Sequence, residues 1–327
     1  MDKSTREINW GILGAGRIAG TFATDLKKLE GARLLAVGSR SQDKAGQFAH
    51  EYGCERAYGS YEALIADPEV DVIYVATPHP YHLENAQACL RGDKAVLCEK
   101  PMALNAGQVR DMVACARERG LFMMEAMWTR FLPVTAEVRK WLAAGRIGEI
   151  RLFTADFGFR TGWNPEGRLL NPALGGGALL DVGVYTVAYA AMVLGRSPET
   201  VQAQAHIGAT GVDEQSALLL GYDGGRLAVL SCAVRTSTRH GAYIDGAAGS
   251  IHIDRFWRAT SATLRVEDQD PVTFEAPAGY HYEAQEVMDC LRAGELESPL
   301  MPLDESIAIA ETLDRARAQI GLRYPME

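Results

Sequence analysis

Near the start of the chain the sequence reads Ile8-Asn-Trp-Gly-Ile-Leu-Gly14-Ala-Gly16-Arg-Ile-Ala19. An apolar run suited to one buried strand leads into the pattern Gly-x-Gly-x-x-Ala, and a helical pattern follows. In such a turn Gly14 allows the tight bend, Gly16 lets a pyrophosphate approach the backbone, and Ala19 lets the helix pack close to the strand. A purely structural turn is the alternative for a lone glycine pattern. Because this one lies between a strand and a helix, it predicts a dinucleotide-binding βαβ unit.

Residues 1–126 repeat this strand–helix alternation. Apolar runs without polar interruption, typical of strands buried on both faces, occupy 8–13, 34–37, 72–76, 95–98 and 122–124. Amphipathic stretches between them predict helices at 18–29, 42–52, 61–65, 83–90 and 106–119. The repeated units predict a doubly wound parallel sheet of the Rossmann type, whose ligands bind outside the carboxyl ends of the strands.

The pattern changes after residue 126, and residues 127–327 are predicted to form a second domain. Strand-like stretches occupy 150–157, 200–206, 216–222, 227–234, 242–245, 250–254, 262–266 and 272–274. Helical patterns occupy 134–144, 282–291 and 304–320, and a further helix ending near residue 194 interrupts the strands. The expected fold class is α/β plus α+β, with a C-terminal domain built on a large, mostly antiparallel open sheet.

Composition and charge exclude several classes of protein. The 327 residues are 47% hydrophobic and carry a net charge of −9, which argues against a nucleic-acid partner because such binding needs clustered Lys and Arg. We find no run of ~18 apolar residues and expect no membrane span. Residues 1–10 do not resemble a signal peptide. Six scattered cysteines without a CxxC pattern are typical of free thiols, so we expect a cytoplasmic protein.

The end of the second predicted strand distinguishes between the two nicotinamide dinucleotides. NAD-binding domains carry an Asp or Glu there, about 20 residues after the glycines, to bind the ribose hydroxyls. This sequence has Ser39-Arg40-Ser41 instead. An arginine can pair with a 2′-phosphate, and serine hydroxyls can hydrogen-bond it. Ser39 and Arg40 therefore favour NADP(H), with NAD(H) and a solvated loop arginine as the alternative.

Two further motifs carry groups suited to proton transfer. The fifth predicted strand ends in Glu99-Lys100-Pro101, at the edge where a nicotinamide would lie. Farther along, the sequence reads Gly-Gly-Gly-Ala-Leu-Leu-Asp181-Val-Gly-Val-Tyr185. The carboxylate of Asp181 and the phenol of Tyr185 are four residues apart in a helical stretch, so they share a face of the helix. An ammonium beside a phenol lowers the pKa of the phenol and makes it useful in acid–base catalysis. Read singly, Lys100 and Asp181 could be surface residues and Tyr185 the edge of a core.

Together the motifs resemble the glucose–fructose oxidoreductase/inositol dehydrogenase (Gfo/Idh/MocA) family of NAD(P)-dependent oxidoreductases. Within it, residues 124–133, Met-Glu-Ala-Met-Trp-Thr-Arg-Phe-Leu-Pro, resemble the branch of dimeric dihydrodiol dehydrogenases and NADP-dependent D-xylose dehydrogenases. The resemblance implies that Lys100 positions the substrate hydroxyl and the nicotinamide ribose, and that the bond before Pro101 is cis. It also implies that Tyr185 is the acid/base and that Asp181 belongs to the same motif.

These considerations define the candidate site residues. The candidate catalytic residues are Lys100, Tyr185 and Asp181. The candidate cofactor-binding residues are Gly14, Gly16, Arg17, Ile18, Ser39, Arg40, Thr77, His79, His82, Glu99, Lys100 and Pro101. The candidate substrate pocket, whose aromatic faces suit a sugar or a cyclohexadiene ring, consists of Trp128, Phe157, Trp163 and Trp257. His79 and His82 have HxxH spacing without an evident third ligand, so we expect no metal.

The expected activity is hydride transfer between NADP(H) and a secondary alcohol or hemiacetal of a D-xylose-like sugar or a trans-dihydrodiol. A reductase for a keto-sugar or an anhydro-sugar, and a non-catalytic NADP(H)-binding sensor, are the alternatives. Apolar residues such as Leu218-Leu-Leu220 exceed what one covered face of a sheet requires. The resemblance implies a homodimer formed through this sheet, and a two-layer monomer is the alternative.

Overall fold

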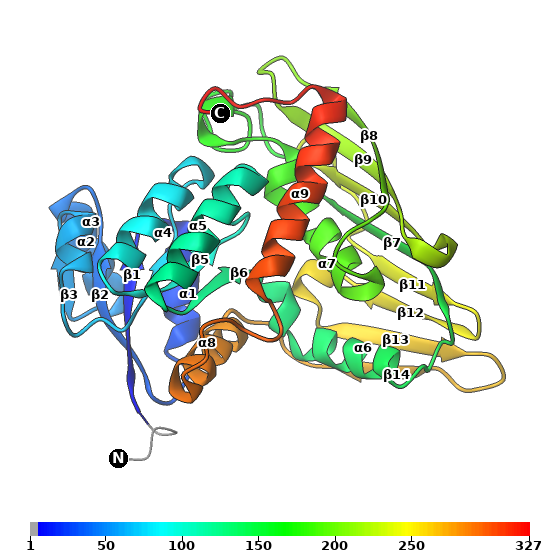
Figure 1. Cartoon of the computed structure of the whole chain (residues 1–327), viewed down its shortest axis with the longest axis horizontal. Coiled ribbons are helices and arrows are strands. Elements are labelled where there is room, and N and C mark those ends of the chain that lie inside the picture. Colours follow the sequence, from blue (N-terminus) through cyan, green and yellow to red (C-terminus); the bar gives the residue numbers. More distant parts are fainter. Residues whose placement is uncertain (1–5) are drawn as a thin grey trace. The chain divides into compact units, whose positions relative to one another are not determined.

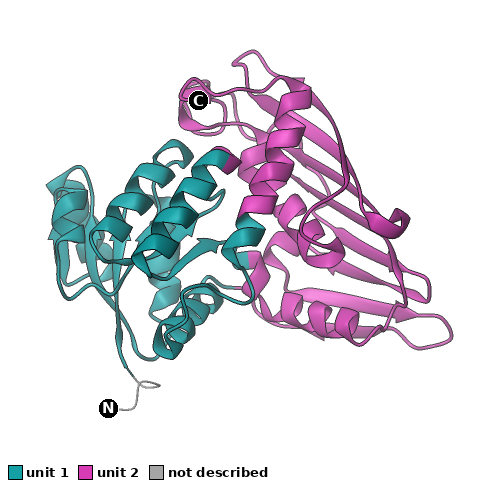
Figure 2. Cartoon of the chain, viewed as in Figure 1, with its two compact units in different colours: residues 1–103, 107–128, 279–306 teal, residues 104–106, 129–278, 307–327 magenta. Residues whose placement is uncertain are grey.

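Residues 6–327 are described by a computed structural model, in which the chain divides into two units (Figure 2). Of the described residues, the first unit comprises 6–103, 107–128 and 279–306, and the second comprises 104–106, 129–278 and 307–327. The sequence predicts two continuous domains that meet at residue 126. Each compact unit of the structure combines three segments of the chain. We expect no signal peptide in residues 1–10, and residues 1–5 of this segment lie outside the described residues.

The first unit is built on a six-stranded parallel sheet with the strand order β3-β2-β1-β4-β5-β6 (Figure 1). Its strands are β1 (Ile8–Leu13), β2 (Ala32–Gly38), β3 (Arg56–Tyr58), β4 (Val72–Val75), β5 (Ala95–Glu99) and β6 (Met123–Ala126). Its helices are α1 (Arg17–Leu26), α2 (Gln42–Tyr52), α3 (Tyr61–Ile65), α4 (His82–Arg91), α5 (Ala106–Arg119) and, from late in the sequence, α8 (His281–Ala293). The order reverses direction between β1 and β4, so right-handed crossovers place helices on both faces. The predicted Rossmann-type sheet is confirmed.

Burial explains which elements of this sheet the sequence predicts. Every residue of β4 and β5 is buried, which is why these strands read as unbroken apolar runs. The pattern does not predict β3, because its three residues are only half-buried and include an arginine and a tyrosine. Parallel pairing with β2 holds β3 in the sheet without an apolar run.

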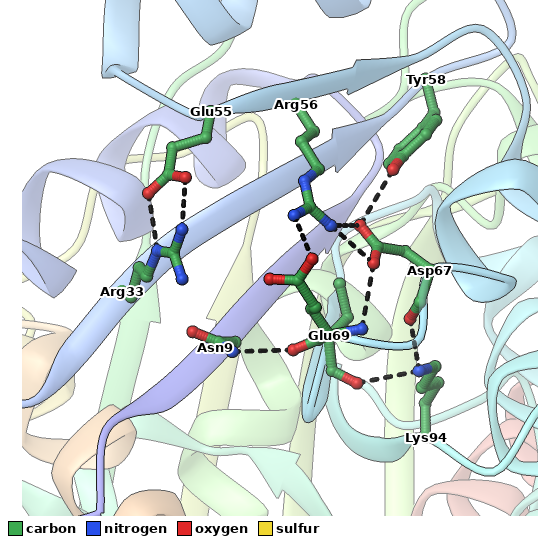
Figure 3. Close-up of polar contacts among 9 residues, drawn as sticks. Asn9, Arg33, Glu55, Arg56, Tyr58, Asp67, Glu69 and Lys94 are labelled. Atoms are coloured by element: carbon green, nitrogen blue, oxygen red, sulfur yellow. Dashed lines mark hydrogen bonds and ion pairs between the residues drawn. The ribbon is translucent and has the colours of Figure 1, made fainter.

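Asp67 is the centre of a polar network at the amino end of this sheet (Figure 3). Arg56 donates two hydrogen bonds of 2.8 Å to its carboxylate, and Tyr58 donates a third of 2.9 Å. Lys94, just before β5, donates to the backbone carbonyl oxygen of Asp67 at 2.6 Å. Burial tends to raise the pKa of Asp67, but the hydrogen bonds outweigh it and lower that pKa overall. Arg56 begins β3 and Lys94 directly precedes β5, so this part of the network lies at the starts of strands, opposite the edge where ligands of such sheets bind.

We expect Asp67→Asn to lower the free energy of unfolding by ~2 kcal/mol, because it removes a buried charge that several donors meet. Chemical denaturation followed by circular dichroism measures the loss. Glu55, which pairs with Arg33, provides a matched control: its side chain is 48% exposed, against 1% for Asp67. Glu55→Gln should cost only ~0.5 kcal/mol, as exposed ion pairs do. Equal losses in the two variants would contradict this account.

The second unit is built on an eight-stranded sheet with the order β14-β13-β12-β11-β7-β10-β9-β8. Its strands are β7 (Ile150–Gly158), β8 (Thr200–Ile207), β9 (Asp213–Gly221), β10 (Leu227–Ala233), β11 (Ala242–Gly246), β12 (Gly249–Asp254), β13 (Ser261–Val266) and β14 (Val272–Glu275). Neighbouring strands are antiparallel except β7 and β10, which are parallel. The predicted large, mostly antiparallel open sheet is confirmed.

One face of this second sheet is covered by helices and the other is exposed. Figure 1 shows α6 (Pro133–Ala143), α7 (Val184–Leu194) and α9 (Leu303–Ile320) on the same side of it. Along β10 the buried side chains of Ala228 and Leu230 alternate with Leu227 and Val229, which are 41% and 45% exposed. This alternation is typical of strands with one packed face. The uncovered face therefore carries apolar side chains in contact with solvent.

Residues 172–194 form the most apolar helical segment of the described chain. It contains a π-helical stretch, Leu179–Gly183, followed directly by α7. Among residues 6–327, this is the one helix long and apolar enough to cross a membrane, with a mean hydropathy of 1.6. Of its most apolar stretch, 94% is buried inside the protein. The core helix of a folded domain is equally apolar, and α7 packs against β7 and β10.

Candidate active site

The turn after β1 leaves room for an anionic group at the start of α1. Gly14 has a φ of +105°, and a Cβ there would lie 3.0 Å from the carbonyl oxygen of Ala76, just after β4. Gly16, the N-cap of α1, faces open space, since nothing lies within 4 Å of where its Cβ would be. The helix then begins with the exposed Arg17 and the half-buried Ile18. Its first backbone N–H groups can therefore receive a phosphate.

Ser39 and Arg40 follow β2 at this same edge of the sheet. Ser39 is buried, and its backbone N–H donates to the carbonyl oxygen of Tyr58 at 3.0 Å. Arg40 is exposed, and its guanidinium lies 5.9 Å from the centre of the Tyr81 ring. Burial raises the pKa of Tyr61, and the nearby Arg40 charge opposes that rise. Arg40 thus presents its charge beside two aromatic residues at the carboxyl edge.

His82 joins the loops that follow β4 and β5. Its ring is fully buried, with Nδ1 at 2.9 Å from the carbonyl oxygen of Pro101 and Nε2 at 2.7 Å from that of Thr77. Burial lowers the pKa of His82, while the two carbonyl oxygens act in the opposite direction. The buried His79 ring lies 5.8 Å away, edge-on. Within residues 6–327, no group of three or more His, Cys, Asp or Glu is arranged to hold a metal ion.

Glu99 fixes the backbone at Lys100. One carboxylate oxygen accepts a hydrogen bond from the Tyr74 hydroxyl, and the other accepts one of 3.1 Å from the backbone N–H of Lys100. Burial raises the pKa of Tyr74 well above its ordinary value, so the phenol stays protonated and acts as the hydrogen-bond donor to Glu99. The peptide bond before Pro101 is cis, which confirms what the resemblance implies. Lys100 itself is half-buried at the end of β5.

The candidate cofactor-binding residues therefore lie on one edge of the first sheet. They follow β1, β2, β4 and β5, and the strand order reverses between β1 and β4. In doubly wound sheets such a reversal opens a crevice beyond the carboxyl ends of the strands, which is where ligands bind. The local sequence explains the shape of this edge: a glycine turn after β1 and prolines at 78 and 101 after β4 and β5.

The second unit carries Asp181 and Tyr185 on one helical segment. Asp181 lies in the π-helical stretch and Tyr185 in the first turn of α7, and both side chains are buried. Such wide turns occur frequently at functional sites. Arg168 places Nη1 at 2.6 Å from Oδ1 of Asp181, and the arginine side chain is 50% exposed. Asp181 is therefore a buried, paired carboxylate and not a surface one.

Tyr185 belongs to an aromatic group that includes two of the predicted pocket residues. Phe157 lies 5.6 Å from Tyr185 and stacks on Trp257 at 4.6 Å between ring centres. His240 packs against Phe157 at 5.1 Å and accepts a hydrogen bond from the indole N–H of Trp257 at Nδ1. The structure thus brings Phe157, Trp257 and Tyr185 together.

The other two predicted pocket residues have different ring and charge contacts. Trp163 is 55% exposed and lies beneath Arg235, whose guanidinium is 5.7 Å from the ring centre. Trp128 belongs to the first unit, where it is buried and stacks on Tyr280 at 4.2 Å.

Comparison with known proteins gives a match along most of the chain. Residues 8–127 match an oxidoreductase family with an NAD-binding Rossmann fold, and residues 135–252 match the C-terminal domain of the Gfo/Idh/MocA family. A trans-1,2-dihydrobenzene-1,2-diol dehydrogenase from Mus musculus is 40% identical over 331 residues, covering 98% of this chain and 99% of the relative.

Solved structures match over a similar length. A 3-ketoreductase from Actinomadura kijaniata, in complex with NADP and TDP-benzene, has a TM-score of 0.86 and 29% identity, covering 96% of this chain and 98% of that one. An aldose-aldose oxidoreductase from Caulobacter crescentus has a TM-score of 0.88 and covers 96% of this chain and 97% of that one. At 24% identity, the second similarity shows the fold alone.

Proposed function

The chain belongs to the Gfo/Idh/MocA family of oxidoreductases, and we propose that it transfers a hydride between NADP(H) and a CH–OH group of a sugar or a trans-dihydrodiol. The observation that carries this proposal is the near full-length similarity to trans-dihydrodiol dehydrogenases. A dehydrogenase needs a nucleotide site, an acid/base and a substrate surface, and the chain has candidates for all three. The first unit supplies the nucleotide site in this proposal, and the second supplies Tyr185 and the aromatic substrate surface.

A nicotinamide dinucleotide fits the carboxyl edge of the first sheet. The open space at Gly16 and the uncapped start of α1 suit a pyrophosphate. Arg40 and Ser39 would bind the 2′-phosphate of NADP, and Arg17 and Ile18 would line the turn. The loop residues Thr77, His79, His82, Glu99, Lys100 and Pro101 would shape the nicotinamide end. The bound nicotinamide supplies the acceptor or donor of the hydride.

We assign proton transfer to Tyr185 with the help of Lys100. A phenol has a pKa near ~10, which makes it a poor base at neutral pH. An ammonium group acting on the same substrate hydroxyl would favour the phenolate and so make the tyrosine a usable base for oxidation. The same phenol would act as the acid in carbonyl reduction. Asp181, held by Arg168, would orient the hydroxyl through its carboxylate.

A substrate panel tests the proposal directly. Sugars, including D-xylose, and a trans-dihydrodiol are offered with NADP+ and with NAD+, and reduced cofactor is followed by its absorbance. We expect oxidation of at least one compound, faster with NADP+. Binding of NADPH without turnover of any compound in either direction would instead indicate a non-catalytic sensor.

A keto-sugar reductase is the second candidate, favoured by the structural similarity to a 3-ketoreductase bound to NADP and TDP-benzene. The chemistry is the reverse of alcohol oxidation, so the same residues serve both. Adding keto-sugars with NADPH to the panel separates the two, because a reductase would consume NADPH with a keto-sugar and leave free aldoses unoxidised.

The uncovered face of the second sheet supports a homodimer. Leu219, Leu227, Val229 and Tyr243 expose between 38% and 45% of their surface there. Two copies packed sheet on sheet would remove these side chains from water. We expect a dimer in analytical ultracentrifugation, and we expect Val229→Glu to weaken it at least ~10-fold by burying a charge. Glu137→Gln, on the half-buried Glu137 of α6, is the control; a wild-type monomer at micromolar concentration would contradict the proposal.

We also propose a cytoplasmic location. All six cysteines are free thiols in the structure, and five of them are buried. Free thiols are typical of reducing compartments.

A further inference from the structure

Asp213, the first residue of β9, is fully buried and fastens the start of the helical segment that carries Asp181 and Tyr185. Its Oδ2 accepts a hydrogen bond of 2.7 Å from the backbone N–H of Leu179 and another of 2.7 Å from the hydroxyl of Ser216. Leu179 is the first residue of the π-helical stretch. Its N–H is one of those that a helix start leaves without an intrahelical partner. Asp213 thus acts as an N-terminal cap supplied by a distant strand.

The loop before this helix is shaped around the same carboxylate. Gly177 has a φ of +116°, and a side chain there would collide with Oδ1 of Asp213. That oxygen has no hydrogen-bond partner among the described residues. Tyr324 also holds the loop, because its hydroxyl donates a hydrogen bond of 2.8 Å to the carbonyl oxygen of Gly176. The loop is therefore tied down by Asp213 and Tyr324.

The carboxylate is poised to change its charge near neutral pH. Burial raises the pKa of Asp213 from 3.8 to about 6, against the lowering effect of Ser216, backbone N–H groups and Arg317. The ionisable groups that interact with it are Arg317, the Cys232 thiol and the Tyr324 phenol. Burial raises the pKa of both the thiol and the phenol, which stay neutral here. Arg317 also pairs with Asp314 and Glu327.

We propose that Asp213 is a positioning residue: its carboxylate holds the start of the helix bearing Asp181 and Tyr185, and its protonation loosens that start. The inference rests on the proposed function, since it assigns a consequence for turnover to this helix. A protonated carboxyl is a weaker acceptor for the Leu179 N–H. Tyr185 follows six residues later, so a shift at the helix start moves its hydroxyl. A displacement of ~1 Å is enough to slow a reaction that depends on geometry.

The pH dependence of kcat/KM tests the inference. We expect a limb that rises with pH and has an inflection near pH 6. Removing the Ser216 hydroxyl takes away a group that lowers the pKa of Asp213, so Ser216→Ala should move the inflection to higher pH. Asp213→Asn should abolish it and reduce kcat ~10-fold at pH 8, the effect of one weakened hydrogen bond. An inflection unchanged in both variants would overturn the proposal.

A second measurement keeps the inference separate from the proposed function. Hydrogen exchange of residues 178–186, corrected for intrinsic rates, needs no substrate. In the wild type we expect protection of this segment to fall below pH 6, and in Asp213→Asn to be low at every pH. Protection that does not depend on pH or on Asp213 would refute the inference even if the enzyme oxidises sugars. If no substrate turns over but protection follows this pattern, only the proposed function fails.

Thr312→Ala is the matched control for the Ser216 variant. Thr312 is also buried in the second unit, and its hydroxyl donates one hydrogen bond of 2.9 Å, within α9. The variant should leave the inflection and the exchange of residues 178–186 unchanged. A shift of the inflection in Thr312→Ala equal to that in Ser216→Ala would mean that general destabilisation, and not Asp213, sets the profile.

Discussion

Replacing Tyr185 by phenylalanine should lower kcat at least ~100-fold, the lower end of what general acid–base catalysis contributes. The variant keeps the ring that packs against Phe157 and loses the hydroxyl that would exchange a proton with the substrate. The affinity for NADP+ should change by less than ~3-fold, because no proposed cofactor contact is removed. Steady-state kinetics on the best substrate of the panel, together with NADPH fluorescence titration, measures both quantities.

Tyr189→Phe is the matched control for this variant. Tyr189 lies one helical turn later on α7 and packs between Phe153, at 5.7 Å, and Phe256, at 5.5 Å. It faces the core, so loss of its hydroxyl should leave kcat within ~3-fold of the wild-type value. If Tyr185→Phe retains near wild-type turnover, Tyr185 is removed from the mechanism. If both variants lose activity equally, packing of α7 and not the phenol is responsible.

The sequence predicts the fold correctly where burial imposes a periodic pattern of apolar residues. Helices over 42–52, 61–65 and 106–119 have the predicted bounds, because their apolar faces and caps are local features. Ser41 and Ser60 cap the first two through backbone N–H groups of the first turn. β3 and the π-helical stretch are not predictable in this way. β3 is held by its partner strand, and the π-helical stretch is held by Asp213 from another strand.

The candidate site shows the same division. The glycine turn, Arg40 and Lys100 can be predicted from the sequence, because each belongs to a short motif at the end of a strand. Arg168 and His240 cannot be predicted in this way, since their partners are distant in the sequence. Arg168 meets Asp181 thirteen positions later, and His240, just before β11, meets Phe157 of the neighbouring strand β7. No spacing rule connects such pairs, so only the folded chain brings them together.

Arg40→Ala should weaken NADP+ binding ~10- to 100-fold and NAD+ binding by less than ~3-fold, because a charge-assisted bond to a phosphate contributes about 1.5–3 kcal/mol. Arg40 is exposed and its described contacts are with aromatic residues, so its charge is available for a 2′-phosphate. The loss should shrink as ionic strength rises, since salt screens an exposed pair. Calorimetric titration of both cofactors at two salt concentrations measures it.

Arg33→Ala is the control that separates a local contact from a general charge effect. Arg33 lies near the start of β2, whereas Arg40 follows its end, and both substitutions remove one positive charge from the same unit. A field effect of the whole unit would weaken NADP+ binding in both variants. A specific bond to the 2′-phosphate predicts a loss in Arg40→Ala alone, confined to NADP+. Equal losses of NADP+ and NAD+ affinity in Arg40→Ala would refute the assignment of the 2′-phosphate site and leave Arg40 a general electrostatic contributor.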